Sequence, residues 1–269
     1  MNGRPGVLVI GHGTADPVGA AETRQVAATV ASLLPDVPVE LGFLEVIAPT
    51  IGDAVARLAA RGCGSLVAAP LLLFAAGHAT RDVPEAVAAA AASQGMDVRQ
   101  TAAFGCCEEI VTLSRARRHE ALAGRGRVAA AETALVMIGR GSSDPAAVTH
   151  LAALADAALA GEERPARVEL GFVAAAAPRL ADALETACDP TATRLRRVLV
   201  QPHLLFRGHV EDEVTDAVER SRARRADLEW IQVARLGADP LVARAVIRRI
   251  AEVCAPQSLT RQGRSESSQ

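Results

Sequence analysis

An internal duplication constrains this sequence more than any other feature. Four landmarks occur twice, in the same order and at nearly constant spacing: VIGHG at 9–13 and MIGRG at 137–141, GFLE at 42–45 and GFVA at 171–174, PLLLF at 70–74 and PHLLF at 202–206, and GH at 77–78 and 208–209. Self-similarity at a nearly fixed offset indicates two copies of one structural unit. We therefore expect an N-terminal domain at 1–122, a second copy at 134–255, a linker at 121–133 and a disordered Ser-rich tail at 256–269.

Short apolar runs alternate with Ala-rich segments of helical length in both copies. The runs lie at 7–10, 37–43, 65–73 and 98–104, and again at 135–138, 168–173, 198–205 and 228–236. Strands that alternate with helices are typical of a parallel sheet with helices on both faces. Asp16-Pro17 and Asp144-Pro145 predict helix starts, and 82–85 resembles a capping box. The predicted fold class is α/β, with two flavodoxin-like three-layer α/β/α domains in tandem.

Composition excludes several partner classes. The net charge is −2, and the chain has five Phe, one Trp and no Tyr, which leaves little for stacking on bases or for attracting a large polyanion. No apolar run approaches the length of a signal sequence core or a membrane span. The five cysteines form neither a CxxC pair nor an even secreted framework. We expect a cytoplasmic monomer without nucleic-acid or membrane partners.

Three polar residues follow the first three predicted strands of the first copy. They are His12, Glu45 and His78. Ligands of open parallel sheets bind beyond the carboxyl ends of the strands, so these side chains can converge there. Imidazole with carboxylate suits Fe, Co, Ni or Zn, and three protein ligands leave coordination positions open. Histidine also accepts protons near neutral pH. The set predicts a site that handles a divalent metal while removing protons.

Other residues have plainer interpretations. Each of the three site residues alone is more often a cap or a solvated group, and only their conjunction favours function. The run Gly11-His12-Gly13 begins like a dinucleotide fingerprint, but Asp16 stands where the third glycine belongs. We expect surface histidines, a solvated arginine face and a buried cysteine pair at these positions: His119 and His150; Arg115, Arg117 and Arg118; Cys106 and Cys107.

At its landmarks the sequence resembles the class II tetrapyrrole chelatases of the CbiX and SirB type, which act on sirohydrochlorin. The matching pieces are GHGT at 11–14, FLE at 43–45 with PTI at 49–51, and PLLLFAAGH at 70–78 with DVP at 82–84. The resemblance covers roughly 6–254. It implies two chelatase-like halves with a cleft for the macrocycle. It also implies a divalent metal, Co²⁺ or Fe²⁺, as substrate and no tightly bound cofactor.

The resemblance further assigns roles to residues. It places the metal and catalytic positions at His12, Glu45 and His78. In the second copy Arg140 and Ala174 replace the first two, while His209 keeps the third, so that copy is not expected to insert metal. Sirohydrochlorin carries carboxylates, which arginines and helix N-termini can bind. The candidate substrate-binding residues are Arg81, Arg140, Arg207 and His209.

Three alternatives stay open at this point. A metal-binding or delivery protein would keep the ligands without catalysing insertion. A histidine phosphatase would also place a histidine after its first strand, although that class uses Arg-His-Gly and the residue before His12 is Gly11. A non-catalytic domain partner would need neither histidine. An imidazole and carboxylate site accepts cobalt as well as iron, so the residues do not choose between them.

Overall fold

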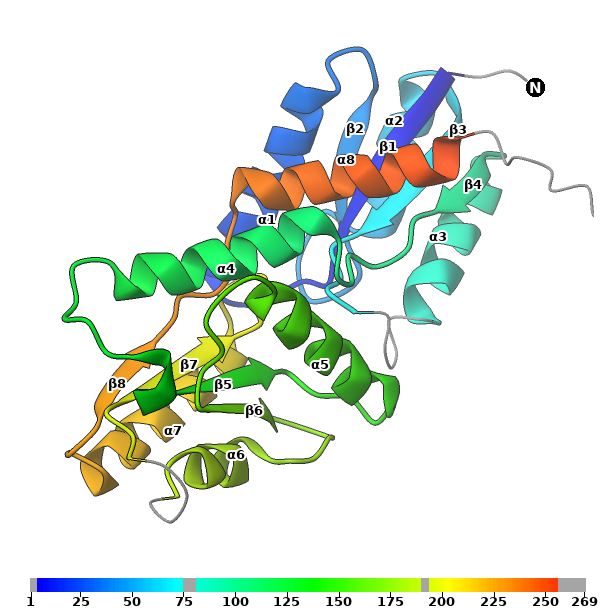
Figure 1. Cartoon of the computed structure of the whole chain (residues 1–269). Helices are drawn as coiled ribbons and strands as arrows, with labels where there is room; N and C mark the ends of the chain where they lie inside the picture. Colours follow the sequence, from blue (N-terminus) through cyan, green and yellow to red (C-terminus); the bar gives the residue numbers. More distant parts are fainter. Residues whose placement is uncertain (1–3, 75–80, 190–193, 256–269) are drawn as a thin grey trace, which may run out of the picture.

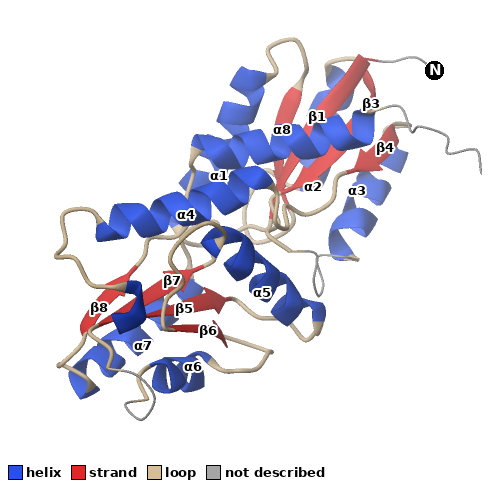
Figure 2. Ribbon diagram, viewed as in Figure 1, coloured by secondary structure: helices blue, strands red, loops and turns tan. Residues whose placement is uncertain are grey.

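The computed structural model describes residues 4–74, 81–189 and 194–255, and each half contains one parallel four-stranded sheet (Figure 2). The first sheet has the order β2-β1-β3-β4 and comprises β1 (Arg4–Gly11), β2 (Val39–Phe43), β3 (Cys63–Pro70) and β4 (Asp97–Gln100). The second has the matching order β6-β5-β7-β8 and comprises β5 (Thr133–Gly139), β6 (Arg167–Phe172), β7 (Arg197–Pro202) and β8 (Glu229–Gln232). The predicted tandem α/β fold is confirmed.

Helices cover both faces of each sheet. Successive strand residues point to opposite faces, so Leu8 and Ile10 of β1 face one layer while Val7 and Val9 face the other. The Leu8 face packs against α2 (Ile51–Ala60) and α3 (Asp82–Ser93). The corresponding face of the second sheet packs against α6 (Leu180–Ala187) and α7 (His209–Arg224).

The two remaining faces share one continuous core, because the last helix of each half lies on the other half's sheet. α8 (Pro240–Cys254) packs beside α1 (Pro17–Leu33) over the first sheet, and α4 (Glu108–Leu122) packs beside α5 (Ala146–Leu159) over the second (Figure 1). Val9 of the first sheet and Met137 of the second both belong to this core. The exchanged helices therefore hold the halves together.

The exchange buries an arginine that the sequence suggested was solvated. Arg118 of α4 is 3% exposed, and its guanidinium donates to Gln201 Oε1 of β7 at 3.2 Å and to Glu162 Oε2 at 2.5 Å. Gln201 Nε2 donates in turn to the carbonyl oxygen of Ser114 at 2.7 Å. The expectation of a solvated arginine face is wrong for Arg118, because α4 packs on a sheet formed by later parts of the chain.

Helix starts were predicted with mixed success. Asp16 caps α1 by accepting from the backbone N–H groups of Val18 and Gly19, as expected. Asp144 accepts from the N–H of Ala146, but the N-cap of α5 is Pro145, so the second helix begins one residue later than the predicted cap. The predicted capping box at 82–85 is wrong, because Asp82 already lies in the first turn of α3 and the N-cap is Arg81. The capping box lies instead at 50–53, where Thr50 and Asp53 bond reciprocally.

Two sequence predictions fall on segments outside the described residues. They are the third site histidine, His78, and the disordered tail at 256–269. The predicted linker is traversed by the end of α4, a loop and a short 3₁₀ helix (Ala130–Glu132) that leads into β5. Within the described part of the chain, no helix is long and apolar enough to span a membrane.

Candidate active site

His12 and Glu45 meet at the carboxyl edge of the first sheet. β1 and β2 are neighbouring parallel strands, and their pairing continues past their ends: Leu44 N–H donates to Gly11 O at 2.9 Å and Glu45 N–H donates to His12 O at 3.1 Å. This backbone contact brings His12 Nε2 to 3.0 Å from Glu45 Oε1. The side chains are 47% and 58% exposed, so an imidazole and a carboxylate both face solvent. The predicted convergence of these two residues agrees with this geometry.

Glycine is required at position 13 by the same contact. Gly13 has φ +103°, and a Cβ atom built there would overlap the carbonyl oxygen of Glu45. Residues other than glycine rarely adopt this backbone conformation. Gly141 of the second half has φ +92°, and a Cβ atom there would overlap the carbonyl oxygen of Ala174. The glycines thus permit the close approach of the two loops in each half.

The second half repeats the backbone of the site without its ligands. Ala174 N–H donates to Arg140 O at 2.9 Å, just as Glu45 donates to His12. Arg140 is exposed at the end of β5, and Ala174 offers no carboxylate. Within the part of the chain that the structure describes, no three His, Cys, Asp or Glu side chains gather as a metal site. The membership of His78 in the first-half site stays a prediction.

The other candidate residues have different surroundings. Arg81 is 71% exposed at the start of α3, 4.0 Å from Asp82. His209 is exposed as the first residue of α7. Arg207 donates from Nη2 to Asp212 Oδ1 at 2.5 Å and from Nη1 to the carbonyl oxygen of Gly208 at 2.8 Å. The Asp212 carboxylate raises the pKa of Arg207, and the guanidinium lowers the pKa of Asp212. The charge of Arg207 is therefore already offset within the protein.

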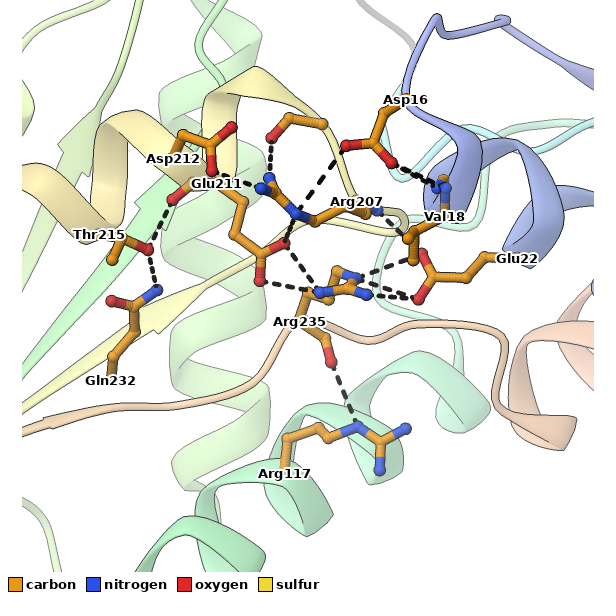
Figure 3. A network of polar contacts seen from close by, with 12 residues as sticks. Asp16, Val18, Glu22, Arg117, Arg207, Glu211, Asp212, Thr215, Gln232 and Arg235 are labelled. Atoms are coloured by element: carbon orange, nitrogen blue, oxygen red, sulfur yellow. Dashed lines mark hydrogen bonds and ion pairs between the residues drawn. The ribbon is translucent and has the colours of Figure 1, made fainter.

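A network of ion pairs joins the two halves next to the start of α1 (Figure 3). Glu22 of α1 accepts from Arg235 Nη2 at 2.6 Å and from the backbone N–H of Arg207 at 2.9 Å. Arg235 Nη1 also donates to Glu211 Oε2 of α7 at 2.8 Å. The halves approach so closely here that a Cβ atom on Gly19 would overlap the carbonyl oxygen of Arg207. Sequence reasoning missed Glu22 and Arg235, because no motif links two residues so far apart in the chain.

A family model described as CbiX matches residues 6–121 and, separately, 134–253. The chain belongs to the CbiX family. The two matches confirm the resemblance inferred from the sequence, and they coincide with the two sheets of the structure.

Curated relatives of this CbiX-family chain include chelatases of both metal types. A sirohydrochlorin ferrochelatase of Priestia megaterium is 31% identical over 216 residues, which cover 80% of this chain and 78% of the relative. A sirohydrochlorin cobaltochelatase of the same organism is 28% identical over 232 residues, covering 83% and 72%. The sirohydrochlorin ferrochelatase of Bacillus subtilis strain 168 is 27% identical over 257 residues, covering 93% and 92%.

Solved structures match over nearly the whole chain. SirB from Bacillus subtilis with Fe³⁺ has a TM-score of 0.77 at 25% identity, covering 94% of this chain and 96% of that one. The sirohydrochlorin chelatase SirB from Bacillus subtilis subspecies spizizenii, in complex with cobalt, has a TM-score of 0.71 at 23% identity, covering 93% and 94%. The chelatase-like fold predicted from the resemblance is therefore confirmed.

An aromatic contact between the halves of this CbiX-family chain was not predicted. Phe74, from the loop after β3, lies with its ring centroid 5.3 Å from those of both His150 and His203. His203 follows β7 directly and is 3% exposed, and its Nε2 has no hydrogen-bond partner among the described residues. Burial lowers the pKa of His203 from 6.5 to about 3, so the imidazole is neutral at physiological pH. The first half has Leu71 at the matching position. The histidine in place of this leucine is therefore the one signal in the sequence that sets His203 apart.

Two minor expectations need correction. His150 is not simply a surface residue, because its ring stacks on Phe74 and its Nδ1 is buried. The cysteine pair was expected to be buried, but this holds for one member alone: Cys107 is buried, whereas Cys106 is exposed. The first correction reflects the packing of α5 against a loop of the other half, and the second reflects the start of α4 at the surface.

Proposed function

We propose that this CbiX-family chain is a chelatase that inserts a divalent metal, Co²⁺ or Fe²⁺, into sirohydrochlorin in cobalamin or sirohaem biosynthesis. The observation that carries the proposal is the His12–Glu45 pair, which is exposed at the sheet edge where ligands of such folds bind. The names of the ferrochelatase and cobaltochelatase relatives support the reaction, and the solved structures with Fe³⁺ and cobalt support the class of metal.

Metal insertion makes two demands on the protein. The metal must exchange bound water for ring nitrogens, and the two pyrrole N–H protons must leave as the dication takes their place. The separation of 3.0 Å between His12 Nε2 and Glu45 Oε1 allows both atoms to face one small ion. Because the protein supplies only a small number of ligands, coordination positions on the metal stay open for the incoming ring nitrogens. His12 and His78 would hold the metal or accept ring protons, and Glu45 would act as a ligand or as a proton acceptor.

The second half would serve the anionic substrate instead of the metal. Arg140 is exposed at the position that matches His12, and Arg81 is also exposed, so these two cations can meet carboxylates of the macrocycle. His209 is exposed as well and offers a hydrogen-bonding imidazole. Arg207 is a weaker candidate, because Asp212 already accepts from its guanidinium. We also propose that the protein acts as a cytoplasmic monomer with a metal-bearing half at 1–122 and a substrate-binding half at 134–255.

Anaerobic metallation tests the proposal directly. Purified protein is mixed with sirohydrochlorin and either Co²⁺ or Fe²⁺, and the absorbance change on metallation is followed against a protein-free control. We expect the protein to accelerate insertion of at least one of the two metals. The proposal fails if no divalent metal is inserted faster than in the uncatalysed reaction.

The main rival function is divalent-metal binding or delivery without catalysis. That function predicts tight binding of Co²⁺ or Fe²⁺ by the protein alone, together with an uncatalysed rate of insertion into sirohydrochlorin. Titration calorimetry with the metal and the absorbance assay with the macrocycle therefore separate the two. Metal binding with accelerated insertion supports the chelatase, whereas binding without acceleration supports delivery.

A further inference from the structure

Glu45 is followed by a tight turn with an unusual backbone conformation. Ile47 N–H donates to the carbonyl oxygen of Glu45 at 2.8 Å, and the residue between them, Val46, has φ +70°. A three-residue turn with a positive φ at its centre is the classic γ-turn, which is rare and strained. A β-branched residue in this region of backbone space is an outlier, because its two Cβ substituents crowd the backbone.

The second half shows that the fold needs the turn but not the valine. Ala176 N–H donates to the carbonyl oxygen of Ala174 at 2.7 Å, and Ala175 at the centre has φ +53°. The same turn is therefore built around alanine, which lacks the branched Cβ. A valine in the first-half turn adds strain that the backbone contact itself does not require.

Burial does not explain the valine either. Val46 is 63% exposed, and the other exposed large hydrophobic side chains of the described residues, Val18, Leu33 and Val98, are 51%, 46% and 36% exposed. A strained and exposed apolar residue gains nothing from the core of its own protein. Strain that persists without such a gain points to a function at that position.

The position of Val46 suggests what it contacts. A Cβ atom built on Gly13 would lie 3.6 Å from the Cβ of Val46, so the valine stands beside the residue that follows His12 and directly after Glu45. Aromatic residues do not supply an apolar surface here, because no aromatic side chain of the described residues is among the exposed hydrophobics. Val46 is therefore an exposed aliphatic surface directly beside the His12–Glu45 pair.

We propose that Val46 is a specificity-determining residue that packs against the flat apolar face of the macrocycle beside the His12–Glu45 pair. This inference rests on the proposed function, since it takes the ligand to be a large conjugated ring. The carboxylates at the rim of such a ring bind cations, whereas its face needs an apolar contact. The turn directs the valine side chain outward. The favourable contact with the ring in the complex compensates for the backbone strain of the turn.

The test compares stability and binding in matched variants. Val46→Asn removes the apolar group and suits a positive φ, so we expect its Tm to stay equal or rise while the Kd for metal-free sirohydrochlorin rises about ten-fold. Val46→Ile should keep the wild-type Kd. As a control, Ala175→Val places the branched side chain in the second-half turn and should lower Tm without changing that Kd. Binding is measured by quenching of sirohydrochlorin fluorescence, and the KM for Co²⁺ shows whether Glu45 has moved.

The outcomes separate this inference from the proposed function. An unchanged Kd in Val46→Asn, or a fall in its Tm together with a raised KM for Co²⁺, would overturn the role of Val46, because the side chain would then serve the fold or hold Glu45. Failure of the wild-type protein to accelerate metallation would overturn the proposed function alone. The binding assay contains no metal, so it would still test the contact of Val46 with the ring. Failure of the wild type to bind sirohydrochlorin overturns both.

Discussion

His12 Nε2 lies 3.0 Å from Glu45 Oε1, although the two side chains come from different loops of the first sheet. The contact depends on neighbouring strands and on the backbone hydrogen bond from Glu45 to His12, and the second half repeats that bond between Ala174 and Arg140. The two halves therefore differ in side chains rather than in local backbone. This difference makes each half a control for the other.

Loss of either ligand should strongly slow metal insertion. We expect His12→Ala and Glu45→Gln each to lower kcat for metallation by about 100-fold or more, as loss of a positioned base or ligand does. His78→Ala should behave alike, whereas Arg140→Ala and His209→Ala should mainly raise the KM for sirohydrochlorin. The absorbance assay measures both constants. An equal loss of kcat in all the histidine variants would mean that the site is misplaced in one half.

Two glycine variants should separate damage to the fold from damage to the site. Gly13→Ala and Gly141→Ala each place a Cβ atom on a carbonyl oxygen at a positive φ, so both should lower the free energy of unfolding by about 1–3 kcal/mol. Only Gly13→Ala displaces the backbone of Glu45, so only it should lose most of its kcat. Urea denaturation and the metallation assay check the pair. Comparable activity in the two variants would contradict the assigned site.

Much of the fold could be predicted because its signals are local. Strands appear as short apolar runs, and the cap at Asp16 needs only the residues beside it. The pairing of His12 with Glu45 could also be predicted, since adjacent parallel strands end at the same edge of a sheet. These inferences need the order of the elements and nothing about distant packing.

The exchange of α4 and α8 could not be predicted in this way. Each helix follows the last strand of its own repeat, and either sheet can accept an apolar helix face. Contacts such as Arg118 with Gln201 and Glu22 with Arg235 join residues that no sequence motif connects. The choice of partner is a property of long-range packing, so the buried Arg118 of α4 resembles a solvated arginine in the sequence.

Breaking the ion-pair network between the halves should lower stability. In Arg235→Met, Glu22 and Glu211 lose their shared partner while their side chains are only 16% and 14% exposed. We expect a loss of about 1–3 kcal/mol, below the range for fully buried pairs because some exposure remains. Adding Glu22→Gln should restore part of this loss. Urea denaturation measures it, and an unchanged midpoint in Arg235→Met would show that the network contributes nothing.

The matched control breaks an exposed ion pair. Arg164 donates to Asp156 at 3.1 Å, and the side chains are 63% and 66% exposed. Arg164→Met should cost less than about 1 kcal/mol, as exposed pairs do.

The buried imidazole of His203 should make stability depend on pH. Its pKa is about 3 in the folded protein and near 6.5 when unfolded, so between these values only the unfolded chain binds the proton. The stabilising contribution is fully present above pH 6.5 and is lost as pH falls, by up to about 1.4 kcal/mol per unit. His203→Leu, which copies Leu71, should remove this slope.

Urea denaturation of both proteins between about pH 7 and about pH 4.5 checks the slope. Groups elsewhere titrate equally in the two proteins, so their difference isolates His203. His119→Gln is the control, because that imidazole is 61% exposed. Parallel pH profiles for the wild type and His203→Leu would show that the pKa of His203 is the same in the folded and unfolded states.

The repeated backbone also predicts that a metal site can be built in the second half. Arg140→His with Ala174→Glu places the ligand pair of the first half on loops joined by the same hydrogen bond, 2.9 Å long instead of 3.1 Å. We expect the double variant to bind a second equivalent of Co²⁺ in calorimetry, weakly, because solvent supplies most of the remaining ligands. Neither single variant should do so, since each provides only one side of the pair. If the double variant still binds no additional Co²⁺, matching backbones do not suffice to place the two ligands, and the 3.0 Å contact between His12 and Glu45 depends on surroundings that the second half lacks.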